Sequence, residues 1–533
     1  MNKIRLLLFT VMVAASAVAV YARIGNMHNP MIWADVPDPD VIRVGDDFYM
    51  VSTTMHLMPG APIMKSKDLV NWETVGYIFD KLTDVPGYCL EGGTEYGRGQ
   101  WATSLRHHNG RFYALFSPNA EPFRSFIYTA ENPAGPWKLV SRTKHFHDSS
   151  FLFDDDGRVY VYSGSGQIRL TELNPDLSDV KEGGIDQVVI EPTEDIIGLH
   201  EGSRTFKHND KYYVMVISWP AGKPRNQLCY RADKITGPYK RMKVLESEFG
   251  GFPYAGQGTI VDDAEGNWWG VIFQDRGAVG RVLTLQPVRW IDGWPMLGDE
   301  DGKIPAKIRK SMANEKNGLP LSMVRSDEFD TDTLNYSWQW NHNPVDAAWS
   351  LSERPGWLRM KTSRKVDNLY MAPNTLSQRM EGPECDAVVR LDLSHMKNGD
   401  VCGFGAFNGH SGLMSVVMER GKKHLVQENL TVNFKEGTKT VETVDRVEIE
   451  RVPLTGNDLW LKLEADFNPG KDTATFSYSL DGENFQPIGK PFHMIYDYRR
   501  LFMGSRPAIY NYATKKTGGY VDVDFFRYNR KDY

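Results

Sequence analysis

Hydrophobic and polar residues follow one plan in five segments of the first 290 residues. Each segment has a polar lead-in, a short apolar stretch, a tight turn and an aromatic-rich second stretch. The segments read PDPDVIRVGDDFYMVSTT, ATSLRHHNGRFYALFSP, DSSFLFDDDGRVYVYSGSG, EGSRTFKHNDKYYVMVIS and GQGTIVDDAEGNWWGVIFQD. Turns such as Asn-Gly and Asp-Asp-Gly between alternating stretches are typical of β-hairpins. We therefore expect five related hairpins.

The spacing of these hairpins indicates a closed radial fold. An aromatic residue stands at the matching place of each second strand, and successive aromatics lie 47 to 64 residues apart: Tyr49, Tyr113, Tyr160, Tyr213 and Trp269. A hairpin-based repeat of about 50 residues is typical of a β-propeller with four strands per blade. We predict an all-β chain that begins with a five-bladed β-propeller. The alternative, an irregular β-sandwich, does not explain five hairpins in register.

The lead-ins of the repeat place acidic residues at equivalent positions. Asp38, Asp148, Glu201, Gln257 and Thr103 each lie 10 to 12 residues before the aromatic of their own segment. Equivalent positions of a radial repeat face the same axis at the same end. Three carboxyl groups, an amide and a hydroxyl are therefore expected at one mouth of the central channel.

Three carboxyl groups in one partly dry pocket predict glycoside hydrolysis. Like charges brought together raise at least one pKa, which a fold tolerates mainly at a functional site. We assign Glu201 as general acid, Asp38 as general base that activates water, and Asp148 as the residue that orients the acid and modulates its pKa. A retaining mechanism with Asp38 as nucleophile is the alternative, and the distance between the carboxyl groups separates the two.

The sequence also resembles glycoside hydrolase family 43. The stretches NPMIWADVPDPDVIRVGDDFYMVSTT, QWATSLRHHNGRFYALFS, HDSSFLFDDDGRVYVYSG, HEGSRTFKHNDKYYVM and GRVLTLQPVRWIDGWP carry this resemblance in order. The family implies a five-bladed propeller, inversion at the anomeric carbon, and a base, a modulator and an acid that fall on Asp38, Asp148 and Glu201.

The C-terminal part resembles the β-sandwich of the β-xylosidase and α-L-arabinofuranosidase branch of that family. GDVCGFGAFNGHSGLMSVV and FMGSRPAIYNYATKKTGGYVDVDFFRY carry the likeness, and short alternating stretches such as LWLKLEADF agree with it. We expect a signal peptide at 1–22, the propeller at 23–300, a linker at 301–325 and a concanavalin-like jelly-roll sandwich at 326–533.

Two departures from the family bear on ligands. Where β-xylosidases of this branch have an aromatic-rich STFEWFPG, this chain has STTMHLMPG at 52–60, which favours an arabinofuranoside over a xyloside. Gln257 stands where the family often has a histidine over the propeller axis. No cofactor is required by the chemistry; a structural Ca²⁺ stays open, but Gln257 disfavours it, and no metal ligand is assigned.

Six residues are candidates for sugar binding. Trp101 matches a family tryptophan near the mouth of the pocket, and Arg281 matches an arginine that reaches sugar hydroxyls. Arg204, which follows the acid by three residues in the family motif, is expected to orient carboxylates rather than bind the sugar. The full set of substrate-binding candidates is Trp101, Arg281, Gln257, Trp33, Trp219 and His56.

Composition restricts the partners and the compartment. The net charge is −6 without a basic block, which argues against nucleic acid. A positive start, an apolar run to residue 20 and small residues near 19–22 predict a secretory signal peptide, and so export, with the periplasm favoured over secretion and no membrane association after cleavage. Four widely spaced cysteines are expected as free thiols. The oligomeric state is left open.

The leading functional prediction is an inverting exo-acting α-L-arabinofuranosidase that acts on plant cell-wall polysaccharides or oligosaccharides. A β-D-xylosidase, or an enzyme with both activities, is the close alternative, because the two sugars present similar hydroxyl patterns. A non-catalytic glycan-binding protein is the alternative from another class, and the complete set of acid, base and modulator argues against it.

Overall fold

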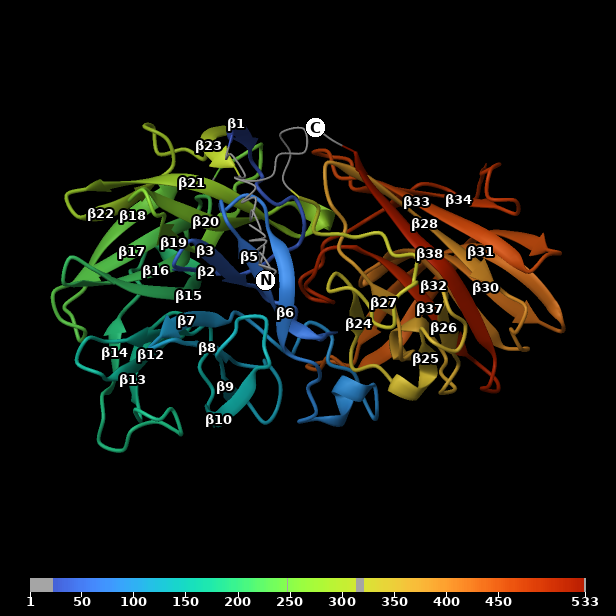
Figure 1. Cartoon of the computed structure of the whole chain (residues 1–533), viewed down its shortest axis with the longest axis horizontal. Helices are drawn as coiled ribbons and strands as arrows, with labels where there is room; N and C mark the ends of the chain where they lie inside the picture. The colour runs from blue at the N-terminus through green and yellow to red at the C-terminus, as the bar shows by residue number, and fades with distance from the viewer. Residues whose placement is uncertain (1–22, 247, 313–320, 532–533) are drawn as a thin grey trace, which may run out of the picture.

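The computed structural model describes residues 23–246, 248–312 and 321–531. The predicted signal peptide lies outside these residues. Two bodies built of strands lie side by side, the propeller in blue to green and the sandwich in yellow to red (Figure 1). The prediction of an all-β chain with a five-bladed propeller and a C-terminal sandwich is confirmed. Within the described part, no helix has the length and apolar character needed to cross a membrane.

Five antiparallel four-stranded sheets form the blades. Blade one holds β2 (Asp40–Val44), β3 (Asp47–Val51), β5 (Gly60–Ser66) and β6 (Glu73–Phe79). Blade two holds β7 (Ser104–His108), β8 (Arg111–Phe116), β9 (Arg124–Ala130) and β10 (Lys138–Lys144). Blade three holds β11 (Ser150–Phe153), β12 (Val159–Ser163), β13 (Ile168–Leu173) and β14 (Asp186–Ile190). Blade four holds β15 (Ile196–His208), β16 (Lys211–Pro220), β17 (Asn226–Ala232) and β18 (Lys240–Glu246). Blade five holds β19 (Ala255–Asp262), β20 (Trp268–Asp275), β21 (Arg281–Ile291) and β22 (Trp294–Leu297).

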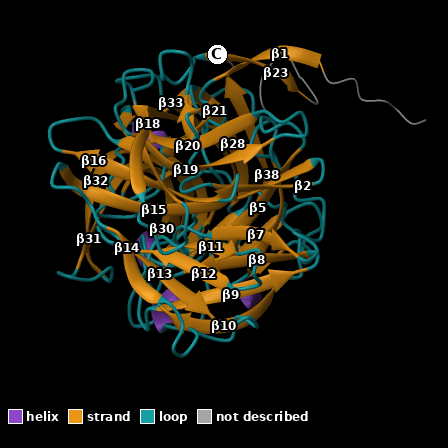
Figure 2. Cartoon of the chain, turned by 90° about the vertical axis from the view of Figure 1, so that its left-hand side faces the viewer, coloured by secondary structure: helices purple, strands orange, loops and turns teal. Residues whose placement is uncertain are grey.

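The first strands of the blades form a closed ring. Strand β2 contacts β7, β7 contacts β11, β11 contacts β15, β15 contacts β19, and β19 returns to β2 (Figure 2). The segment before blade one adds a second link between the first and last blades, because it lies along the free edge of β21 in blade five. Ile32 bridges Leu283, the Val36 backbone amide donates to the Arg281 carbonyl at 2.9 Å, and the side-chain amide of Asn29 donates to the Leu285 carbonyl at 2.8 Å.

Apolar layers between neighbouring blades explain the aromatic repeat. Each of the five repeat aromatics belongs to a different layer, between blades one and two, two and three, three and four, four and five, and five and one: Tyr49, Tyr113, Tyr160, Tyr213 and Trp269. The pattern seen in the sequence is thus one repeat aromatic at each blade interface, with four of the five buried and Tyr113 partly buried. Burial of large aromatic rings is a main source of stability in such a core.

Two sheets form the sandwich, and a large apolar cluster fills the space between them. One sheet runs in the order β32 (Val441–Leu454), β31 (Lys422–Phe434), β30 (His410–Glu419), β29 (Asp400–Phe407), β37 (Arg506–Ala513), β27 (Leu376–Ser377), β24 (Gln339–Asn341) and β4 (Leu57–Met58). The other runs in the order β25 (Trp349–Ser350), β26 (Leu358–Lys361), β38 (Tyr520–Lys531), β28 (Glu384–Asp392), β33 (Asp458–Asp466), β34 (Thr473–Ser479) and β35 (Gln486–Pro487), and β36 (Phe492–His493) also pairs with β34. Four short 3₁₀ turns complete the described elements: η1 (Pro86–Cys89), η2 (Gly277–Val279), η3 (Asp346–Ala348) and η4 (Leu369–Met371).

The two domains share one sheet. Strand β4 leaves blade one and pairs with β24, so that Leu57 lies opposite Asn341 and Met58 opposite Trp340. Outside the sheets, β1 (Arg23–His28) pairs with β23 (Lys307–Met312), which lies in the segment expected to be a linker. All four cysteines are free, as the sequence analysis expects, and three of them are buried.

Candidate active site

The three predicted carboxyl groups lie in one pocket. Asp38 precedes β2, Asp148 precedes β11, and Glu201 lies on β15. All three line a cavity of about 750 Å³, and propeller and sandwich residues form its walls. The radial repeat therefore brings together side chains that are more than 160 residues apart in sequence.

A shared backbone conformation turns these side chains inward. Asp38, Asp148 and Gln257 have φ angles of 54°, 45° and 63°, in the left-handed region that residues other than glycine rarely adopt. In blade four the positive φ falls on Gly202, directly after Glu201. A Cβ atom on Gly202 would lie 2.4 Å from the Gln257 side chain, so glycine is required by the close approach. Strained conformations of this kind persist at functional positions.

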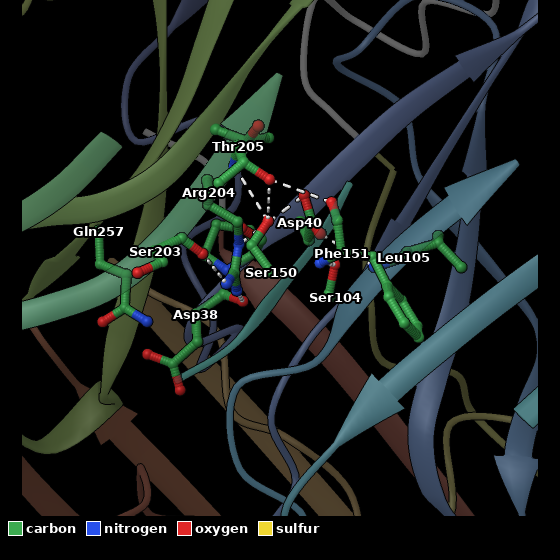
Figure 3. A network of polar contacts seen from close by, with 12 residues as sticks. Asp38, Asp40, Ser104, Leu105, Ser150, Phe151, Ser203, Arg204, Thr205 and Gln257 are labelled. Carbon is green, nitrogen blue, oxygen red and sulfur yellow. Dashed lines mark hydrogen bonds and ion pairs between the residues drawn. The ribbon is translucent and has the colours of Figure 1, made fainter. Parts of the chain in front are cut away.

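Arg204 links the chain segments at the bottom of the pocket (Figure 3). Its fully buried guanidinium donates to the Asp38 carbonyl at 2.9 Å and lies 3.7 Å from the Asp40 carboxylate. Arg106 of blade two donates to the same Asp40 at 2.7 Å and to Ser150 of blade three at 2.7 Å. Arg204 thus fixes the backbone that carries Asp38 and does not bond its carboxylate.

Asp38 has a fixed orientation. The Thr53 hydroxyl donates to Oδ2 at 2.6 Å, and Nη1 of Arg281 donates to Oδ1 at 3.2 Å. Arg281 is 4% exposed, and its Nε and Nη2 are buried without a hydrogen-bond partner. A carboxylate oriented in this way suits a general base, and the two remaining donors of Arg281 suit hydroxyl groups of a sugar.

Glu201 has a different neighbour, His147, which the sequence did not single out. Its Nε2 lies 3.0 Å from Oε2 of Glu201 and 3.9 Å from Oδ1 of Asp148. Burial of the ring disfavours its charge, but Asp148, Glu201 and the more distant Asp38 outweigh burial and raise the pKa of His147 to about 9. At neutral pH the imidazole is therefore a cation that hydrogen-bonds Glu201.

The two acids near His147 shift in opposite directions. Burial raises the pKa of Asp148 to about 6, with further raising by the charges of Glu201 and Asp38 and an opposing effect of His147. Burial also acts to raise the pKa of Glu201, but the hydrogen bond and charge of His147 prevail and lower it. This differs from the expectation that Glu201 itself holds a proton in the free site, since the proton resides on its histidine partner.

Four of the six substrate-binding candidates line the pocket. Trp101, Trp219, Gln257 and Arg281 do so, whereas Trp33 and His56 are absent from its lining. Trp33 lies one layer behind, where its ring stacks on Arg276, whose guanidinium also covers the pocket residue Phe252 at 5.1 Å.

His56 is a correction to the sequence prediction. Pairing of the adjacent β4 with the sandwich draws its ring into the domain junction, where it is 0% exposed. Its Nδ1 accepts from the Gly97 amide at 3.1 Å, and its ring contacts Tyr96 and His342. Burial lowers the pKa of His56 to about 3, so the ring is neutral and structural.

The sequence left open whether the sandwich contributes to the pocket, and the structure shows that it does. Residues between β36 and β37 close one side of the pocket, and Phe502 lies 4.5 Å from the guanidinium carbon of Arg281. The hydroxyl of Tyr496 is buried without a hydrogen-bond partner and lies in this wall. Phe502 belongs to the FMGSRP stretch that carried the family resemblance, which was the available signal.

The donor atoms in the pocket do not suit a Ca²⁺ ion. Among the described residues, one group of potential metal ligands is close enough to share an ion, namely His147, Asp148 and Glu201. Ca²⁺ takes about six to eight oxygen ligands, whereas this group offers two carboxyl groups and an imidazole nitrogen. Gln257 points its amide Nε2, a donor, to Asp148 at 3.5 Å. The residues on the axis therefore do not fit a Ca²⁺ ion.

Comparison with known proteins agrees with this geometry. Residues 27–295 match the family described as "Glycosyl hydrolases family 43", and residues 326–529 match "Beta xylosidase C-terminal Concanavalin A-like domain". The chain belongs to glycoside hydrolase family 43. Both parts of the resemblance noted in the sequence are thereby confirmed, and the family is that of glycosidases.

Relatives in this family carry two kinds of name. A Formosa agariphila protein named "Beta-xylosidase" is 30% identical over 95% of this chain and 90% of its own length. A Bacteroides ovatus protein named a non-reducing end α-L-arabinofuranosidase is 30% identical over 74% of this chain and 75% of its own length. A solved structure described as "Bifunctional GH43-CE" from Bacteroides eggerthii is 42% identical over 96% of this chain, with a TM-score of 0.87; this chain spans 64% of that protein.

Proposed function

We propose that the protein is an inverting, exo-acting pentosidase that removes terminal pentosyl units from xylan- or arabinan-type chains. The convergence of Asp38, Asp148 and Glu201 in one pocket carries the proposal. A loop of the sandwich walls one side, which favours a chain end over the middle of a polymer. Asp38 activates water, and Glu201 donates a proton to the leaving oxygen.

The preferred sugar of this proposal is β-D-xylose, with α-L-arabinofuranose as second candidate. The expected arabinofuranoside preference rested on residues 55–58, but only Met55 of these lines the pocket. The relative that spans nearly the whole chain is named a β-xylosidase, which supports the first candidate. Met55 in place of an aromatic wall, and the Bacteroides ovatus relative, favour the second.

Hydrolysis of nitrophenyl β-D-xylopyranoside and α-L-arabinofuranoside by the purified protein tests the proposal. We expect higher kcat/KM on the xyloside and an inverted anomer as first product by NMR. Faster turnover of the arabinofuranoside reverses the order of the candidates, and a retained anomer contradicts the inverting mechanism. Turnover of neither substrate, with binding intact, favours a glycan-binding protein.

Export, with the periplasm as destination, is part of the same proposal. The apolar N-terminal stretch of the sequence supports it. Cell fractionation with N-terminal sequencing of the mature chain tests it, and an uncleaved N-terminus in the cytoplasmic fraction contradicts it.

A further inference from the structure

Glu201 has a titratable cation, His147, as its hydrogen-bond partner, whereas Asp38 is paired with an arginine. A charged histidine, His147, hydrogen-bonds the very oxygen of Glu201 that faces it, at 3.0 Å. The remaining charged or titratable groups that act on His147 are Asp148 beside it, Asp38 across the pocket, and His145 in the same loop, with its ring centroid 6.5 Å away. Three of these four neighbours are acids, so the pocket favours a proton on the imidazole.

The ring is placed both to hold a proton and to regain one. Its side chain is 28% exposed, whereas that of Glu201 is 19% exposed and that of Asp148 8%. Trp101 lies 6.0 Å from its ring centroid and forms the adjoining wall. The backbone is fixed as well, since the His147 carbonyl accepts from the Gly164 amide at 2.9 Å.

We propose that His147 stores the proton that Glu201 delivers to the leaving group. This inference rests on the proposed function. In the free site the proton bonds Nε2 of His147 and is shared with Oε2 of Glu201. When the substrate displaces water and desolvates the pair, the ion pair loses its solvation, the Nε2–H bond breaks and the Oε2–H bond forms.

The remaining steps balance the reaction. Glu201 gives the proton to the glycosidic oxygen as the bond from that oxygen to the anomeric carbon breaks. A water molecule forms the new bond to the anomeric carbon and gives its proton to Asp38. Asp38 then releases that proton to solvent, and the exposed edge of His147 takes one up. One water is consumed per bond cleaved, and His147 acts through Glu201 as a positioning residue.

The pH dependence of kcat/KM distinguishes this role from a structural one. The pair with His147 keeps its proton up to the alkaline range, because the pKa of His147 is raised to about 9. In His147→Phe the proton must sit on the carboxyl group itself. For comparison, burial and two neighbouring carboxylates raise the pKa of Asp148 only to about 6. We expect the alkaline limb to move down by at least about one pH unit, with about tenfold lower kcat/KM for each unit above it.

Three further variants test the same point. His147→Gln keeps a hydrogen-bond donor but holds no transferable proton. Its alkaline limb is expected to move to lower pH, as in His147→Phe. His107→Phe is the matched control, since this exposed histidine packs on Phe112 in blade two and is absent from the lining of the pocket, and its profile should stay that of the wild type. Imidazole added to His147→Ala should restore activity in the alkaline range.

A change of leaving group completes the test. Dinitrophenyl glycosides need little acid assistance, so the wild type and His147→Phe should differ by less than about threefold on them, and by about tenfold or more on an unactivated disaccharide. An unchanged or raised alkaline limb in a folded His147→Phe, or in His147→Gln, overturns the inference. Failure of the wild type to cleave any glycoside would instead refute the proposed function, so the two failures are distinct.

Discussion

On each side of the pocket a cationic side chain holds one carboxyl group, but the two cations differ in kind. On the blade-one side, Asp38 is held by the Thr53 hydroxyl and by Arg281, a cation at every working pH. On the side of blades three and four, Glu201 is held by His147, a cation only while it keeps its proton. The backbone geometry is similar on both sides, since Asp38 and Asp148 share the left-handed conformation.

Under the proposed function, this difference lets one repeat position serve two roles. A permanent cation donates a hydrogen bond to Asp38 and orients its carboxylate, which a base needs. A titratable cation places an exchangeable proton beside Glu201, which an acid needs. The radial repeat supplies the positions, and residues outside the repeat pattern supply the protonation states.

Replacement of Asp38 or Glu201 is expected to have the largest effect on kcat, and it tests the two proposed roles directly. Asp38→Asn and Glu201→Gln should each lower kcat on unactivated substrates by about 10²–10⁴-fold, because each removes a proton-transfer group. On dinitrophenyl glycosides the loss should shrink for Glu201→Gln and persist for Asp38→Asn. Asp155→Asn, at an exposed hairpin turn, is the control. Equal losses on both leaving groups would show that the two roles are assigned wrongly.

Loss of the permanent cation comes next. Arg281→Met removes a charge-assisted hydrogen bond to Asp38 worth about 1.5–3 kcal/mol, which corresponds to about 10- to 100-fold in kcat/KM. Arg281→Lys keeps the charge but not the fork that also faces the sugar, so it should recover part of the loss, mainly in kcat. Kinetics on the xyloside measure both. A loss confined to KM, with unchanged kcat, would assign Arg281 to substrate binding alone.

Removal of the Thr53 hydroxyl, which donates to the Asp38 carboxylate, is expected to have a smaller effect. Thr53→Val removes the 2.6 Å hydrogen bond to Oδ2 of Asp38 and keeps the side-chain shape. At about 1 kcal/mol for a hydrogen bond, kcat/KM should fall about fivefold, while Thr53→Ser should stay within about twofold of the wild type. Steady-state kinetics and a thermal melt separate lost orientation from lost stability. A Thr53→Val enzyme as active as the wild type would leave Arg281 as the sole orienting group.

The sequence alone predicts the features of the fold and the site that follow from the five-fold repeat. The repeat predicts that Asp38, Asp148 and Glu201 lie together, because each stands 11 or 12 residues before a blade-interface aromatic, whereas Trp101 and Arg281 were candidates only through the family resemblance. His56 was misplaced because its environment depends on β4 pairing with β24, about 280 residues further on, which no local pattern shows. His147 was overlooked because nothing in a lone histidine reveals that Glu201, 54 residues later, faces its ring.

The sandwich wall offers the mildest test and compares the two domains. Tyr498 is 58% exposed at the rim of the pocket and lies 6.4 Å from Phe502. Tyr498→Ala should raise KM for xylo-oligosaccharides about threefold, because a flat ring on which a second sugar stacks is lost, and should leave KM for aryl glycosides unchanged. Tyr336→Ala, equally exposed but away from this pocket, is the control. If both variants match the wild type on oligosaccharides, the sandwich shapes only the terminal-sugar site through Phe502 and Tyr496. A Tyr498 effect on long substrates alone would extend the functional surface from the propeller onto the sandwich.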